Sequence, residues 1–297
     1  SKSMGNVTAP QDIIKDSGAD ILRLWVAAAD YSDDLRIGPE ILKTFVETYR
    51  KLRNTIRWML GTLAHYDASK KIAHKDMPEL ERLMLHRLSE LAPIIQKAYE
   101  TYYYRKVITE LSAFLNTELS AFYFDIRKDC LYCDAPGDPK RMAYRTVLDT
   151  LFHALVRYAA PVLVFTAEEV WTTRFPDRGS LHLQEIHPLP DSWQDAALAE
   201  RFAALRALRA QVSEAIEPMR REKIVGSSLA ATVTVPADAP EGDLAELFIT
   251  GTVTRGQGDG VQITPTTDPK CGRCWRHLPE VAEDGALCGR CEDVVNG

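Results

Sequence analysis

The six cysteines fall in three pairs, each with two residues between its members: Cys130/Cys133, Cys271/Cys274 and Cys288/Cys291. The last two pairs repeat the sequence Cys-Gly-Arg-Cys on either side of a thirteen-residue spacer. Two such knuckles can point four thiolates at one centre, which suits tetrahedral Zn²⁺ and leaves no open position for catalysis. We therefore predict one structural zinc ion bound by Cys271, Cys274, Cys288 and Cys291.

Other uses of these cysteines fit the sequence less well. A redox disulfide is disfavoured because two knuckles are paired and no thioredoxin-like βαβ pattern surrounds them. An iron–sulfur cluster is kept as the weaker alternative to zinc. Cys130 and Cys133 have no second pair nearby, so we interpret them as ordinary small side chains at the end of a helix. The glycine after the first cysteine of each knuckle is expected to permit the turn and to expose amides to the sulfurs.

Composition is that of a globular protein with more than one domain. The chain has 297 residues, of which 45% are apolar and 26% are charged, so two or three domains are expected. No apolar run is long enough to span a membrane, and no signal peptide pattern is present, so we expect a cytoplasmic protein without a membrane partner. The net charge of −6 argues against a generally basic nucleic-acid-binding surface.

Apolar residues at three- and four-residue steps predict long amphipathic helices. They begin near Pro39, Pro78, Arg105 and Pro139, and the third is expected to run as one helix to about Lys128. Short connections between four such helices favour an antiparallel bundle. A further helix is predicted from Asp195 to about Glu222. The fold class that we predict is mainly α: a helical bundle, then a small α+β module, then the four-cysteine knuckle.

The α+β module is predicted where the apolar period becomes two. Residues 230–235, 249–254 and 261–264 are expected to form strands, and 243–248 a short helix. The complete division is 1–36 as a loop and linker, 37–178 as the bundle, 179–265 as a helix with the small module, and 266–297 as the metal-binding tail.

Two helical stretches carry a local excess of positive charge. Between Pro39 and His65 there are five Lys or Arg residues against two Glu, including Arg50, Arg53 and Arg57. Between Arg201 and Lys223 there are six basic residues against three acidic ones, including Arg220 and Arg221. Arginines one turn apart can meet successive backbone phosphates, although a solvated helix face explains the same pattern. The residues alone leave this choice open.

Both ends of the chain carry motifs of a known family. Ser1-Lys2-Ser3-Met4-Gly5-Asn6 resembles the second signature, Lys-Met-Ser-Lys-Ser, of class I aminoacyl-tRNA synthetases, entered after its first two residues. The stretch that follows, with Gly18-Ala19-Asp20-Ile21-Leu22-Arg23-Leu24-Trp25, resembles the isoleucine-specific branch. The tail Cys-x-x-Cys-Trp…Cys-x-x-Cys resembles the end of bacterial members of that branch. A Pro-x-x-x-x-x-x-Glu-Glu-x-Trp string, Pro161 to Trp171, is similar to a turn of the family's tRNA-binding bundle.

The resemblance implies a function for the parent protein. Such enzymes activate isoleucine with ATP and Mg²⁺ and transfer it to tRNA(Ile), and the lysine that matches Lys2 binds ATP phosphates and stabilises the departing pyrophosphate. Ser1, Lys2 and Ser3 would form the signature loop, with Lys2 as the catalytic residue. The bundle and the tail would bind the anticodon arm. We expect this chain to be the C-terminal part of a longer, monomeric enzyme and to be inactive alone.

The resemblance also indicates candidate RNA-contacting residues: Arg50, Arg53, Arg57, Arg220, Arg221 and Trp275. From Val261 to Gly297 there are six acids against four basic residues, so charge alone does not make the tail a nucleic-acid binder. Its metal could clamp a segment too small to hold a core, or the tail could also touch RNA. Two alternative functions stay open: a valyl-type sister enzyme, and a non-enzymatic helical scaffold with a zinc-stabilised tail.

Overall fold

The structure is a computed structural model that describes residues 8–31 and 34–297. The described chain divides into two compact units. Unit 1 comprises the described residues up to Tyr123 together with Ala143–Gln194, and unit 2 comprises Phe124–Met142 and Asp195–Gly297. Among the described helices, none is both long enough and apolar enough to cross a membrane.

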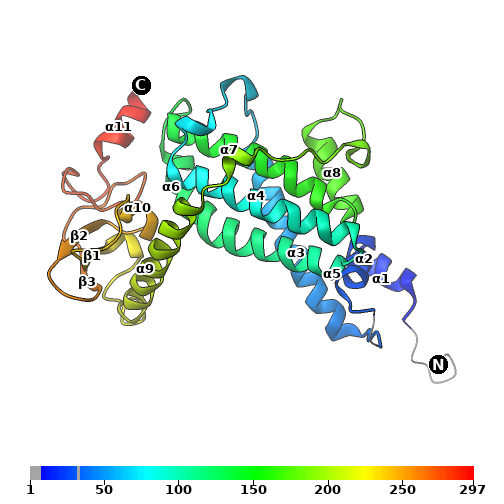
Figure 1. The fold of residues 1–297 in the computed structure, drawn as a ribbon. Helices are drawn as coiled ribbons and strands as arrows, with labels where there is room; N and C mark the ends of the chain where they lie inside the picture. Colours follow the sequence, from blue (N-terminus) through cyan, green and yellow to red (C-terminus); the bar gives the residue numbers. More distant parts are fainter. Residues whose placement is uncertain (1–7, 32–33) are drawn as a thin grey trace. The chain divides into compact units, whose positions relative to one another are not determined.

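Unit 1 is a helical bundle (Figure 1). Its helices are α1 (Pro10–Ser17), α2 (Ala19–Ala28), α3 (Pro39–Thr62), α4 (Glu79–Glu100), α5 (Tyr104–Ala113), most of α7 (Pro139–Ala159) and α8 (Val164–Arg174). Apolar residues spaced three or four apart on α4 and α7 are fully buried, for example Leu88 and Leu155. Trp171, at the end of the family-like string, is also fully buried, and its indole N–H donates to the Gly179 carbonyl. The structure confirms the mainly helical fold class.

The third predicted helix differs from the expectation of one regular helix. α5 ends at Ala113, a π-helical stretch spans Phe114–Phe124, and α6 spans Asp125–Cys133. Leu115, Leu119 and Tyr123 recur at four-residue steps and are all buried. A four-residue step fits an α-helix equally well, so this spacing does not reveal the change to a π-helical stretch. The 3.6-residue pattern therefore overestimated the regularity of this segment.

Two polar side chains of α2 form hydrogen bonds with the backbone at the start of α8. The carboxylate of Asp20 accepts hydrogen bonds from the amides of Phe165 and Thr166 at 3.2 and 2.8 Å and from the Thr166 hydroxyl at 2.6 Å. The guanidinium of Arg23 donates to the Pro161 and Val162 carbonyls at 2.7 and 3.0 Å. The first amides of a helix have no partner within the helix, so Asp20 acts as the cap of α8 from 146 residues away.

Replacing Asp20 by alanine should therefore loosen the start of α8. Asp20 is 5% exposed, so its removal leaves two buried amides without an acceptor, at a cost of about 2 kcal/mol. Hydrogen exchange of the Phe165 and Thr166 amides should accelerate accordingly. Asp16→Ala, which removes an exposed acid from α1, is the matched control. Equal protection of these amides in the wild type and in Asp20→Ala would refute the capping role.

Unit 2 contains the small α+β module, as predicted. Its elements are α6, α9 (Ala196–Arg221), β1 (Ala231–Pro236), α10 (Leu244–Phe248), β2 (Thr252–Gly256), β3 (Gln262–Pro265) and α11 (Gly289–Asn296). The sheet order is β2-β1-β3, with β1 parallel to β2 and antiparallel to β3. Ala231, Val233 and Val235 on β1 are fully buried, which is the two-residue alternation expected of a half-buried strand. The second strand begins later than expected, because Ile249 takes a left-handed conformation that ends α10.

A buried ion cluster joins α6 to α10 within unit 2. Glu246 of α10 pairs with Arg127 of α6 and with Lys140, each at 2.7 Å. The side chain of Arg127 is 3% exposed and that of Glu246 is 12% exposed. Burial by itself raises the pKa of Glu246, but the two cations outweigh burial and hold its pKa below the usual range.

Candidate metal centre and nucleic-acid interface

The four predicted ligands meet in one buried cluster at the end of unit 2. Cys271 and Cys274 lie on a turn, Cys288 is the residue before α11, and Cys291 lies in its first turn. All four side chains are buried, and their sulfurs lie within 4.8 Å of one another. The sulfurs of Cys274 and Cys288 are 3.8 Å apart, which is roughly the edge of a tetrahedron with Zn–S bonds of about 2.3 Å. The cluster fits a closed zinc site.

Backbone amides favour the thiolate form of Cys271, whereas burial raises the pKa values of Cys274 and Cys288. Burial raises the pKa of Cys271, but amides of Cys274, Cys288 and Arg273 donate to its sulfur and bring its pKa down to about 6. One of these hydrogen bonds runs from the Cys288 amide at 3.4 Å. Hydrogen bonds to a charged sulfur stabilise it, and zinc binds the thiolate rather than the thiol. A bound Zn²⁺ would join the turn to α11 and contribute no open coordination position.

The two glycines of the knuckles have different roles. A Cβ on Gly272 would lie 2.4 Å from the Gly285 carbonyl oxygen, so only glycine allows the two backbones to approach. The Gly272 amide indeed donates to the Ala286 carbonyl. Gly289 has open space around the position of a Cβ and begins α11. Glycine is thus sterically required at Gly272, whereas the position of Gly289 has room for a side chain.

Cys130 and Cys133 lie outside this set of sulfurs, as predicted. Among the residues that the structure describes, the metal-ligand cluster consists of the four tail cysteines. Cys133 packs in the same apolar cluster as the tail cysteines without being one of that set of four. Cys130 is 1% exposed and packs within α6 as a small apolar side chain.

The candidate arginines of α3 differ in their exposure and in their ion-pair partners. Arg50 is exposed and pairs with Glu47 on its own helix at 3.3 Å. Arg53 is partly buried and lies 3.9 Å from Glu169 of α8. Arg57 is exposed on the same helix. Arg50 and Arg57 are therefore the more accessible cations of this strip, and exposed pairs such as Arg50–Glu47 are weak enough to exchange partners.

The remaining candidates belong to unit 2 or fall outside the described residues. Arg220 and Arg221 lie in the last turn of α9, and both pair with Glu217 while staying exposed. Trp275 is 61% exposed with a positive φ of 65°, and the Lys270 ammonium lies 5.4 Å from its ring centroid. The predicted signature loop, Ser1, Lys2 and Ser3, lies outside the described residues.

A cavity within unit 2 adjoins Trp275. It has a volume of about 510 Å³ and lies between α6, α10 and the metal-binding tail. Two exposed aromatic rings, Tyr132 and Trp275, and two cations, Lys128 and Arg276, are among its lining residues. Thr250 also lines it, and its buried hydroxyl has no hydrogen-bond partner in the described part of the chain. Of these residues only Trp275 was predicted from the sequence, and Lys128, Tyr132 and Thr250 come from distant segments.

Three family models match the chain. Residues 81–235 match the anticodon-binding domain of tRNA ligases, residues 268–294 match the zinc finger found in FPG and IleRS, and residues 1–38 match class I tRNA synthetases (I, L, M and V). A LeuRS of Agrobacterium radiobacter, solved in a ternary complex with tRNA and LeuAMS, shares the fold with a TM-score of 0.50 over 66% of this chain and 22% of that one. At 17% identity this similarity concerns the fold alone.

Curated relatives share the sequence over nearly the whole chain. The isoleucine–tRNA ligase of Zymomonas mobilis is 51% identical over 99% of this chain and 33% of the relative. That of Gluconobacter oxydans is 47% identical over 100% of this chain and 32% of the relative. That of Brucella abortus is 46% identical over 96% of this chain and 31% of the relative. The chain therefore spans about a third of the length of these relatives.

The helical bundle and the match over more than half of the chain show that the protein belongs to the tRNA ligases with this anticodon-binding domain. Within that class, the zinc finger and the relatives support its assignment as a C-terminal portion of isoleucine–tRNA ligase. The zinc finger model and the four buried cysteines together support a structural zinc.

Proposed function

We propose that this chain is the tRNA-binding part of an isoleucine–tRNA ligase and recognises the anticodon arm of tRNA(Ile). The observation that carries the proposal is the presence, in one chain, of the anticodon-binding domain and the IleRS-type zinc finger. Accessible arginines on α3 and at the end of α9 supply the cations that RNA backbone phosphates require.

The parent enzyme, on this proposal, acts as a cytoplasmic monomer that uses isoleucine, ATP and Mg²⁺. Lys2 would bind the ATP phosphates from the signature loop formed with Ser1 and Ser3, and its charge would stabilise the departing pyrophosphate. Residues 1–38 match the class I synthetases, which supports this assignment. The chain by itself is expected to bind tRNA and to make no isoleucyl-adenylate.

The cavity beside Trp275 is suited to an unpaired base. Aromatic side chains stack on splayed-out bases, and neighbouring cations pair with the adjoining phosphates. Trp275 and Tyr132 offer exposed rings, and Lys128, Arg276 and Lys270 offer positive charge next to them. The free hydroxyl of Thr250 can accept or donate one hydrogen bond to a base edge. We assign Trp275 as the stacking residue of the interface.

Binding of the purified chain to tRNA(Ile) and to a noncognate tRNA, compared over a salt series, tests the proposal. We expect tighter binding of tRNA(Ile) and an affinity that falls steeply with salt. Trp275→Ala should weaken tRNA(Ile) binding by about 1–3 kcal/mol, roughly five- to 150-fold, whereas Trp275→Phe should retain most of the affinity. Zinc content should be the same in both variants and in the wild type.

Three outcomes would contradict the proposal. Equal affinity for all tRNAs at every salt concentration would show that the chain does not recognise the anticodon. Tighter binding of tRNA(Val) than of tRNA(Ile) would indicate a valyl-type function. Absence of tRNA binding would favour a helical scaffold with a zinc-stabilised tail.

A further inference from the structure

Each Cys-Gly-Arg-Cys knuckle carries an arginine, and both arginines contact the end of α6. Arg273, between Cys271 and Cys274, also donates through Nη1 to the sulfur of Cys291 at 3.6 Å, so it connects its own knuckle to the opposite one. Arg290 lies between two of the predicted ligands, Cys288 and Cys291, in the first turn of α11.

The same two guanidinium groups bind the C-terminal end of α6. Arg273 donates to the carbonyls of Cys133 and Tyr132 at 2.6 and 3.2 Å. These carbonyls belong to the last turn of α6, where no amide of the helix can reach them and where the helix dipole favours a cation. Arg273 therefore caps α6 from 140 residues further along the chain.

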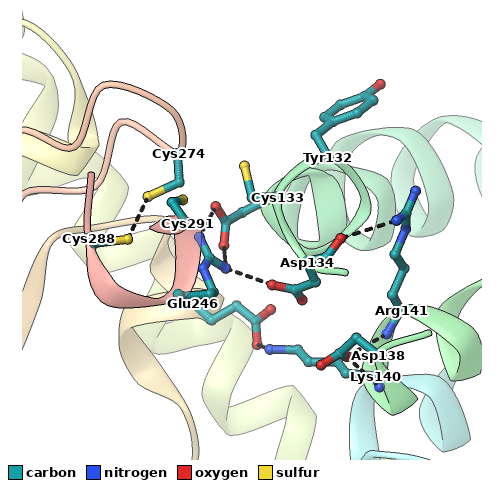
Figure 2. A network of polar contacts seen from close by, with 12 residues as sticks. Tyr132, Cys133, Asp134, Asp138, Lys140, Arg141, Glu246, Cys274, Cys288 and Cys291 are labelled. Atoms are coloured by element: carbon teal, nitrogen blue, oxygen red, sulfur yellow. Dashed lines mark hydrogen bonds and ion pairs between the residues drawn. The ribbon is translucent and has the colours of Figure 1, made fainter. Parts of the chain in front are cut away.

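Arg290 makes the stronger contact with α6. Its two Nη atoms bind both oxygens of Asp129 at 2.6 and 2.9 Å, which is the bidentate geometry of an arginine–carboxylate pair. Nη1 also donates to Asp134 at 2.9 Å. Figure 2 shows Asp134 and Cys133 on the α6 side and the tail sulfurs of Cys274, Cys288 and Cys291 on the other. Arg290 thus joins the first turn of α11, which carries the ligand Cys291, to two carboxylates near the end of α6.

The two arginines act on the metal site in different ways. Four thiolates around Zn²⁺ carry a formal charge of −2, and the guanidinium of Arg273 at the sulfur of Cys291 offsets part of it. Donors to metal-bound thiolates act on the ligands as other outer-shell partners do, and losing such a partner typically costs 10–100-fold in metal affinity. Lysine cannot replace the planar fork with which Arg290 binds both oxygens of Asp129.

We propose that Arg273 and Arg290 are positioning residues that couple the metal site to the end of α6, so that zinc retention and docking of the tail on α6 depend on each other. The coupling is reciprocal. Weakening the Arg290–Asp129 contact from the α6 side should loosen the metal, and removing the metal should expose the end of α6. The proposal concerns the metal centre and stands whether or not the chain binds tRNA.

Zinc release from the intact 297-residue chain to a chromogenic chelator tests the proposal. Arg273→Gln and Arg290→Gln should each release zinc about 10–100-fold faster than the wild type. Arg290→Lys should release zinc nearly as fast as Arg290→Gln. Asp129→Asn leaves both arginines and all four cysteines in place, and it should also accelerate release, by about tenfold, because the Arg290 guanidinium loses its bidentate partner. Hydrogen exchange at the Cys133 and Asp134 amides should rise in parallel in all four variants.

Arg255→Gln is the matched control. Arg255 also binds backbone carbonyls and one carboxylate, Glu241, within unit 2 but away from the cysteines. It should leave zinc release and α6 exchange at wild-type rates. Zinc release within twofold of wild type in both arginine variants would overturn the proposal. Faster release in Arg290→Gln with wild-type release in Asp129→Asn would overturn the coupling to α6.

Discussion

Replacing Cys274 by serine should remove zinc from the chain and unfold the metal-binding tail. A structural zinc site contributes on the order of 10–16 kcal/mol of apparent binding free energy in small zinc-finger peptides, and that energy is folding energy for the segment that binds it. The tail supports this expectation, because its buried cluster consists mainly of the four ligands together with Val281. Without the metal, too little apolar surface remains to order the segment.

The measurement is the zinc content per chain, combined with hydrogen exchange along residues 268–296. We expect zinc to fall from about one ion per chain to a trace and the tail amides to lose protection. Cys133→Ala is the matched control, because Cys133 packs in the same apolar cluster without being one of the four ligands. That variant should keep its zinc. A full complement of zinc in Cys274→Ser, or zinc loss in Cys133→Ala, would show that the ligand set is different.

The sequence predicted the elements of this chain more accurately than it predicted the contacts between them. Stripes such as Leu80, Leu88 and Leu91 define a buried helix face, and the structure places these side chains in the core. The alternation of Ala231, Val233 and Val235 likewise defines β1. These patterns are local, so they can be recognised without knowing the tertiary fold.

The hydrogen bonds and ion pairs that hold the helices and the tail together join residues more than a hundred positions apart in the sequence. Asp20 binds Thr166, Arg127 binds Glu246, and Arg290 binds Asp129. Each of these side chains resembles an ordinary surface charge in the sequence, because nothing local indicates that it becomes buried or paired. Repetition was the one available signal: the same arginine recurs in both Cys-Gly-Arg-Cys knuckles, and a role for it could have been inferred there.

The candidate site was predicted only in part, because some of its residues are close in the sequence and others are brought together by the fold. The four cysteines were found because their spacing is a property of the chain itself. The cavity beside Trp275 was not found, because its walls come from α6, α10 and the tail. The arginines of α3 were identified as a group from the sequence. That Arg53 lies near Glu169 depends on the packing of α8 and could not be predicted.

Replacing Glu246 by glutamine should destabilise unit 2 by on the order of 3 kcal/mol, because the buried charge of Arg127 would lose the carboxylate that lies 2.7 Å from it. Arg127 is 3% exposed, so water cannot solvate it after the substitution. Opening free energies from hydrogen exchange of the α6 and α10 amides measure this loss separately from the stability of unit 1. Glu241→Gln is the matched control, since Glu241 is 89% exposed and pairs with Arg255 at 3.2 Å.

The effect of Glu246 should also depend on pH. The folded protein holds the pKa of Glu246 below its usual value, mainly because Arg127 and Lys140 outweigh the effect of burial. The unfolded chain therefore binds a proton more readily, so the contribution of Glu246 is complete above about pH 4.5 and is lost as the pH falls through the folded-state pKa. The stability difference between the wild type and Glu246→Gln should be largest near pH 7 and should narrow below about pH 4. A difference that stays constant from neutral to acidic pH would mean that the charge of Glu246 is not what stabilises Arg127 in the core of unit 2.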